Sequence, residues 1–131
     1  MTVAKAPTVA VVDDDDAVRD ALSNLLSSLG LAVATFATAE AFLASPACAE
    51  AACLIADIQM PGMSGLDLQR RLADSGNRLP VILITAFPRD HVRQQAEAAG
   101  AFGFFAKPFE GGPMIACIER AIHRSTGGNS P

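Results

Sequence analysis

Residues 53–62 read CLIADIQMPG, and this stretch decides the fold class. The apolar run Cys53–Ala56 has the length and composition of a buried strand, and it delivers Asp57 into a turn that contains Pro61 and Gly62. A lone carboxylate in such a position lies at the edge of a sheet, where ligands bind in open α/β folds. Asp57 is therefore expected at the edge of an α/β sheet, in a position suited to ligand binding.

Other apolar runs also end in charged residues. The run Thr8–Val12 is followed directly by Asp13 and Asp14, and a run that ends at Ala106 is followed by Lys107. Because the carboxyl ends of parallel strands meet at one edge of a sheet, these groups are expected to share a pocket with the carboxylate of the central stretch. Acids and an ammonium gathered in this way are what phosphoryl transfer with a divalent metal needs.

Short apolar runs alternate with segments of helical periodicity along the whole chain. Strands are predicted at 8–12, 32–36, 53–56, 81–85 and 102–106, and helices at 16–29, 39–43, 65–74, 89–99 and from about 113. Five βα units in succession predict a doubly wound α/β fold, with a five-stranded parallel sheet, right-handed crossovers and five helices on its two faces. Gly111 and Gly112 precede Pro113, so a loose start is expected for the last helix.

Length and composition predict a single domain. The 131 residues are 50% hydrophobic, and we expect a core at 8–124 with 125–131 as a flexible tail or the start of a linker. No apolar run approaches the ~18 residues of a membrane span, and Pro7 interrupts the segment where a signal peptide would lie, which predicts a cytoplasmic protein. A net charge of −4 with scattered basic residues excludes nucleic-acid binding by this segment. Cys53 and Cys117 lack C-x-x-C spacing and are expected in the core.

Carboxylates that share one pocket repel one another unless a cation or a proton neutralises them. With no His or thiolate nearby, the oxygens of Asp13, Asp14 and Asp57 favour Mg²⁺, which also accepts phosphate oxygens. Asp57 is then a candidate nucleophile that forms an acyl phosphate. Lys107 can pair with Asp57 or with a phosphoryl oxygen, and Thr85, which ends the predicted strand at 81–85, can donate its hydroxyl to the same oxygen.

Four motifs, in order and at family spacing, give the chain a resemblance to a known family. They are VVDD at 11–14, DIQMPGMSG at 57–65, ITA at 84–86 and KPF at 107–109. Across residues 8–124 the chain resembles the receiver domain of response regulators in two-component signalling. The resemblance implies a flavodoxin-like sheet of order 2-1-3-4-5, a sensor histidine kinase as partner, and an output domain in the same or a separate chain. It implies an autocatalytic phosphoacceptor rather than an enzyme.

The same resemblance implies roles for the acidic residues. Asp57 takes the position of the phosphoacceptor and also of a metal ligand. Asp14 takes the position of a direct Mg²⁺ ligand, Asp13 that of a ligand through water, and Gln59 that of a ligand through its backbone carbonyl oxygen. The implied cofactor is therefore Mg²⁺.

Residues outside the acidic pocket complete the implied switch. Thr85 and Lys107 take positions that contact the phosphoryl group, and Phe104 takes that of an aromatic switch whose ring turns inward on phosphorylation. The change is expected on the face formed by the last two helices and the last strand. Phe102 and Gly103 stand where many receivers carry acidic residues that bridge subunits, so a salt-bridged dimer is not expected. A monomer or a weak phosphorylation-dependent dimer is expected instead.

Two other functions fit parts of this pattern. A receiver-like interaction module that is never phosphorylated would share the fold, but it would not need the acids, Thr85 and Lys107 together. An aspartyl-phosphate phosphatase of the haloacid-dehalogenase type would share the nucleophile. It needs a second acid two residues later, where this chain has Gln59, and a cap domain. Binding of beryllofluoride only when Mg²⁺ is present separates the receiver from both alternatives.

Overall fold

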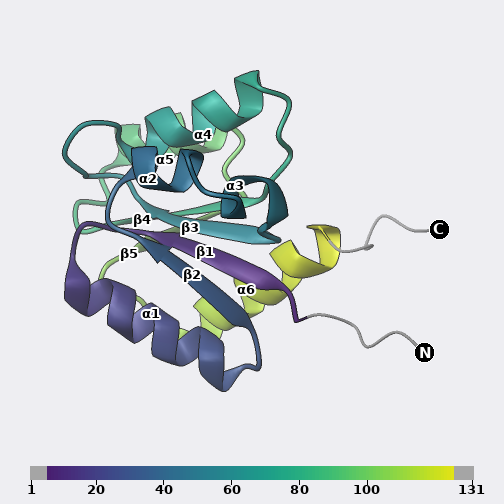
Figure 1. Cartoon of the computed structure of the whole chain (residues 1–131). Coiled ribbons are helices and arrows are strands. Elements are labelled where there is room, and N and C mark those ends of the chain that lie inside the picture. Colours follow the sequence, from purple (N-terminus) through teal and green to yellow (C-terminus); the bar gives the residue numbers. More distant parts are fainter. Residues whose placement is uncertain (1–5, 126–131) are drawn as a thin grey trace.

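A computed structural model describes residues 6–125 of the chain (Figure 1). Residues 1–5 and 126–131 lie outside the described part, and with them the expectations for the N-terminal segment and the C-terminal tail. The described elements are β1 Thr8–Val12, α1 Asp16–Ser28, β2 Ala32–Phe36, α2 Ala39–Leu43, α3 Ala47–Glu50, β3 Cys53–Asp57, α4 Gly65–Asp74, β4 Val81–Thr85, α5 Asp90–Ala98, β5 Gly103–Ala106 and α6 Gly111–Ser125.

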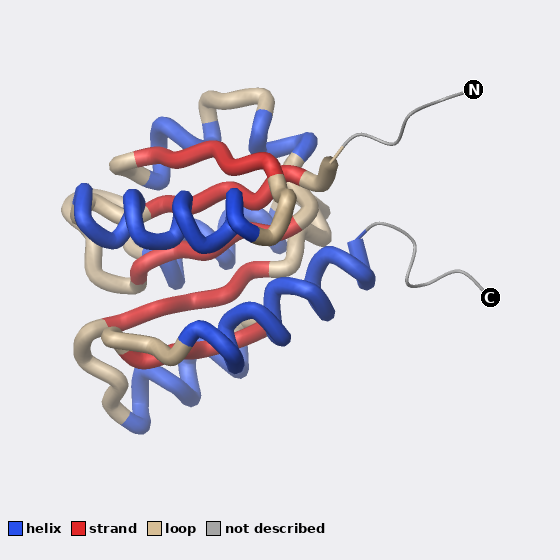
Figure 2. Tube along the Cα trace, turned by 90° about the horizontal axis from the view of Figure 1, so that it is seen from below, coloured by secondary structure: helices blue, strands red, loops and turns tan. Residues whose placement is uncertain are grey.

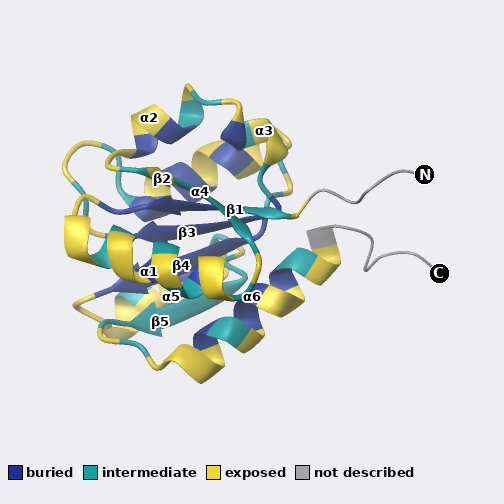
Figure 3. Cartoon of the chain, turned by 60° about the horizontal axis from the view of Figure 1, so that its bottom comes forward, coloured by how far each residue is buried: buried dark blue, intermediate teal, exposed yellow. Residues whose placement is uncertain are grey.

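The five strands form one parallel sheet in the order β2-β1-β3-β4-β5, as predicted. The central strands β1, β3 and β4 are buried almost throughout, whereas the edge strands β2 and β5 are largely half-buried (Figure 3). The register pairs Asp57 with Ile84 and Thr85 with Ala106. The carboxyl ends of the strands therefore lie level along one edge of the sheet, and the strand order reverses between β1 and β3, where ligands bind in such folds.

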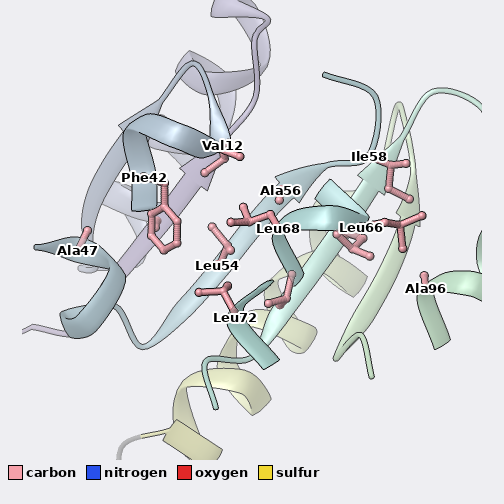
Figure 4. Packing of buried hydrophobic residues seen from close by; sticks show 14 residues of the cluster. Val12, Phe42, Ala47, Leu54, Ala56, Ile58, Leu66, Leu68, Leu72 and Ala96 are labelled. Atoms are coloured by element: carbon pink, nitrogen blue, oxygen red, sulfur yellow. The ribbon is translucent and has the colours of Figure 1, made fainter. Parts of the chain in front are cut away.

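Helices cover both faces of the sheet, with α1 and α6 on one face and α2, α3, α4 and α5 on the other (Figures 1 and 2). Because successive strand residues point to opposite faces, each strand contributes to two separate cores. Ile55 joins Leu22 of α1 and Ile118 of α6, while the neighbouring Leu54 joins Leu68 of α4 (Figure 4). No helix between residues 6 and 125 has the length and apolar character needed to cross a membrane.

Cys53 of β3 and Cys117 of α6 both lie in the core between the sheet and the helices α1 and α6, which confirms that they are core residues. Burial raises the pKa of the Cys53 thiol to about 12, so it stays protonated at neutral pH. Gly103 is part of the same packing, since a Cβ atom there would lie 2.6 Å from Cys117 Sγ. The missing side chain at 103 is what allows α6 to approach β5.

Two helix predictions are wrong. The sequence predicts five helices, but the described residues contain six, because Pro46 does not only end α2. It also occupies the N-cap position of the short helix α3 at Ala47–Glu50, and proline suits a helix start. Helix α6 begins at Gly111 rather than near Pro113. The first four N–H groups of a helix have no partner within it, so the missing N–H of Pro113 removes no bond, and the two glycines belong to the first turn of α6.

Candidate functional site

Three aspartates meet where the carboxyl ends of β1 and β3 lie side by side. Asp57 is the last residue of β3, which extends one residue beyond its predicted end, and Asp13 and Asp14 follow β1 directly. One carboxylate oxygen of each residue lies within 4.8 Å of the other two. Asp13 and Asp57 are buried, whereas Asp14 is exposed. The cluster is therefore accessible to solvent on the Asp14 side.

Lys107 reaches this cluster from the residue after β5. Its Nζ atom donates a hydrogen bond to Asp57 Oδ2 at 2.9 Å and lies 2.9 Å from Asp13 Oδ2. The contact with Asp13 is an ion pair whose angles fall outside those of a hydrogen bond. Burial lowers the pKa of Lys107, but its contacts with the two carboxylates outweigh that effect and leave the pKa above its ordinary value. Lys107 is therefore an ammonium ion shared by two acids.

The environment of Asp57 opposes its charge. Burial is the largest influence and raises the pKa of the Asp57 carboxyl. The hydrogen bond from Lys107 lowers this pKa, the nearby charge of Asp13 raises it, and the balance lies above the ordinary value. The other oxygen, Oδ1, accepts a hydrogen bond from the backbone N–H of Gln59 at 3.0 Å. A further cation placed beside Asp57 would therefore stabilise the charged form of its carboxylate.

The acidic cluster fits Mg²⁺ by its chemistry. Three carboxylates face one ammonium, so the ionised pocket carries a net negative charge. The buried Oδ2 of Asp13 lacks a hydrogen bond. No His or Cys belongs to this group among the described residues, and an all-oxygen donor set is what Mg²⁺ prefers.

Thr85 lies at the end of β4 with its side chain fully buried and its hydroxyl engaged. Its Oγ1 donates a hydrogen bond to Gln59 Oε1 at 2.6 Å and accepts one from the Phe87 N–H at 3.0 Å. Phe87 itself is 58% exposed. The structure thus brings Thr85 to the edge of the pocket, but its hydroxyl is bonded to Gln59 and not to Asp57. The metal-ligand role implied for Gln59 concerns its backbone carbonyl oxygen, and the hydrogen bond between its side chain and Thr85 was not predicted.

Phe104 lies outside the acidic cluster, in β5. It pairs in register with Leu83, two residues before Thr85, and its half-buried ring packs against the core beneath α4 and α5. The guanidinium carbon of Arg93, in α5, lies 4.6 Å from the centroid of the Phe104 ring. This cation–π contact joins β5 to α5.

Two further residues shape the site and are absent from the predictions. Arg19 of α1 donates from Nη1 to the backbone carbonyl of Asp13 at 2.6 Å and also pairs with Asp16. Gly65, at the start of α4, lies so close to β3 that a Cβ atom there would be 2.5 Å from the carbonyl oxygen of Asp57. The spacing of Arg19 from Asp16 was a visible signal for their ion pair. No local pattern indicates either contact with the backbone of the site.

Comparisons with known proteins give a consistent result. A family model described as "Response regulator receiver domain" matches residues 9–119. The response regulator protein TmoT of Ectopseudomonas mendocina is 43% identical over 114 residues, which are 87% of this chain and 52% of TmoT. The solved structure of the response regulator StyR matches with a TM-score of 0.86 and 40% identity, over 95% of this chain and 63% of that one. The FixJ-N crystal structure matches with a TM-score of 0.81 and 38% identity, over 92% of this chain and 96% of that one. The chain spans about half the length of the curated relatives it matches.

Proposed function

The chain belongs to the receiver domains of response regulators in two-component systems, and we propose that it is a phosphorylation switch with Asp57 as its phosphoacceptor. A sensor histidine kinase in the same cytoplasm supplies the phosphoryl group. The observation that carries the proposal is the position of Lys107, whose Nζ lies 2.9 Å from both Asp13 Oδ2 and Asp57 Oδ2. A cation shared in this way aligns the acceptor carboxylate and remains beside it when phosphoryl oxygens arrive.

The transfer needs little covalent chemistry from the protein. An oxygen of Asp57 attacks the phosphorus, a P–O bond forms, and the P–N bond to the kinase histidine breaks with its electron pair going to the imidazole. Lys107 and the Gln59 N–H orient the carboxylate, so positioning and electrostatics carry the step. Mg²⁺, held by Asp13, Asp14, Asp57 and the Gln59 carbonyl, would neutralise the charge that accumulates when carboxylates and phosphoryl oxygens meet.

Phosphorylation then acts as a local change of charge. It replaces the single negative charge of the Asp57 carboxylate with an acyl phosphate that carries roughly −1.5 to −2 charges spread over its phosphoryl oxygens. The Thr85 hydroxyl and Lys107 become ligands of the new oxygens. Thr85 moves toward the phosphoryl group, and Phe104 turns into the space behind it. Because Arg93 covers the Phe104 ring in the resting structure, this turn releases a contact between β5 and α5. The α5/β5/α6 face changes as a result, and it controls an output partner or an output domain of the full protein.

The proposal is tested by phosphorylation with acetyl phosphate and Mg²⁺, followed by intact-mass spectrometry. The wild type and an Asp20→Asn control should each gain one phosphoryl group, because Asp20 is exposed on α1 and has the same charge change. Asp57→Asn should gain none. Equal incorporation in Asp57→Asn would overturn the assignment. A wild type that takes up neither a phosphoryl group nor beryllofluoride would favour an interaction module, and repeated release of phosphate from added phosphomonoesters would favour a phosphatase.

A further inference from the structure

Gln59 connects the phosphoacceptor with Thr85 through two different groups. Its backbone N–H donates to Asp57 Oδ1 at 3.0 Å, and its side-chain Oε1 accepts the hydroxyl hydrogen of Thr85 at 2.6 Å. The Thr85 side chain is fully buried, while Gln59 is exposed. The amide of Gln59 thus ties the turn after β3 to the end of β4.

The Thr85 hydroxyl has one hydrogen and can give it to one acceptor at a time. In the resting structure that acceptor is Gln59, and the hydroxyl oxygen in turn accepts from the Phe87 N–H. A phosphoryl oxygen on Asp57 can receive the same hydrogen only after Thr85 has left Gln59. The Gln59 amide and the phosphoryl group therefore compete for a single donor.

We infer that the Gln59 side chain is a positioning residue that holds Thr85 in its resting orientation and so sets how readily this domain switches. The inference rests on the proposed function. It extends to the loop between β4 and α5, because the Phe87 N–H loses its acceptor when Thr85 turns. Gln59 thereby biases both Thr85 and the loop that carries the exposed Phe87 ring.

Without the amide, the Thr85 hydroxyl has no fixed acceptor in the resting state, and the switched state becomes relatively more favourable. Gln59 is exposed, so water replaces part of what is lost and the effect stays modest. A hydrogen bond of this kind corresponds to about a two- to tenfold change in an equilibrium constant. Gln59→Met is the suitable change, since it keeps the side-chain length and the backbone groups but has no amide.

The first test uses the resting protein without phosphate or its analogues. In Gln59→Met, exchange of the Phe87 amide hydrogen should accelerate, and NMR couplings should report several side-chain rotamers for Thr85 instead of one. Gln94→Met, at an exposed position of α5, is the matched control and should leave both signals unchanged. If Phe87 and Thr85 behave in Gln59→Met as in the wild type, the inference is overturned, whatever the outcome of phosphorylation.

The second test measures beryllofluoride binding in the presence of Mg²⁺. Gln59→Met should reach half-saturation at about a two- to tenfold lower concentration than the wild type. In a Thr85→Val background the same substitution should have no further effect, because the hydroxyl on which it acts is missing. Equal tightening in both backgrounds would show that Gln59 acts on Asp57 directly and would refute the inference. A wild type that binds no beryllofluoride would refute the proposed function, and the resting-state measurements would still decide whether Gln59 holds Thr85.

Discussion

Replacement of Gly65 by alanine tests how closely the fold and the site depend on one another. A Cβ atom at position 65 would lie 2.5 Å from the carbonyl oxygen of Asp57, 3.0 Å from its carbonyl carbon and 3.2 Å from the Cα of Ile58. All three are backbone atoms, so no side-chain rotation can relieve the contact. Ordinary contact begins at 3.4 Å, and the start of α4 must therefore move away from β3 by about 0.9 Å.

The expected loss follows from two opposing effects. Overpacking of this kind costs about 1–3 kcal/mol, while exchange of glycine for alanine in a helix contributes up to about 1 kcal/mol in the other direction. The free energy of unfolding should fall by about 1–2 kcal/mol on balance, which corresponds to a decrease of about 3–8 °C in Tm for a domain of this size. Because Asp57 belongs to the displaced backbone, its phosphorylation by acetyl phosphate should also slow.

Thermal and urea unfolding measure the change, and Gly112→Ala is the matched control. A Cβ atom at 112 would meet nothing within 4 Å, and the backbone there is helical. Alanine at this position should therefore raise the free energy of unfolding, by about 0.4–1 kcal/mol, without affecting phosphorylation. A Gly65→Ala variant that is as stable as the wild type and is phosphorylated at the same rate would refute the argument from the close approach.

Three further outcomes are expected. Millimolar Mg²⁺ should raise the Tm of the wild type by mass action, and Asp14→Ala should remove most of that rise; an undiminished shift in the variant would count against the metal site. Without metal at neutral pH, Asp57→Asn should melt above the wild type. Burial raises the native pKa of Asp57 above its unfolded value, so the wild type loses stability as pH rises between the two, and the difference should shrink as pH falls. A variant that melts below the wild type would contradict this sign. Beryllofluoride should shift amide signals mainly between Phe87 and Ile118, with Phe104 among them. Unchanged amide signals in this range would exclude the α5/β5/α6 face as the output surface.

The local sequence was sufficient to predict a strand or a helix start where the interaction that decides it is itself local. Continuous apolar runs predict the buried strands because both faces of the sheet are covered. Thr38 and Ser64 cap the helices that follow them, since each side chain accepts an N–H only three residues away. Pro46 was ambiguous by the same standard. Proline is compatible with both the end of one helix and the start of the next, so the sequence around Pro46 does not by itself predict the short helix α3.

That Asp13, Asp57 and Lys107 lie together also followed from the sequence, because parallel strands bring them to one edge of the sheet whatever the details of packing. The contacts that these residues make could not be predicted from the sequence. The sequence left open whether Lys107 pairs with Asp57, and only the structure adds the contact with Asp13. The hydrogen bond from Thr85 to Gln59 and the approach of Gly65 to the Asp57 carbonyl depend on tenths of an ångström between separate segments. Alternation and spacing assign a residue to a face or an edge, whereas these distances are set by how the helices and strands pack against one another.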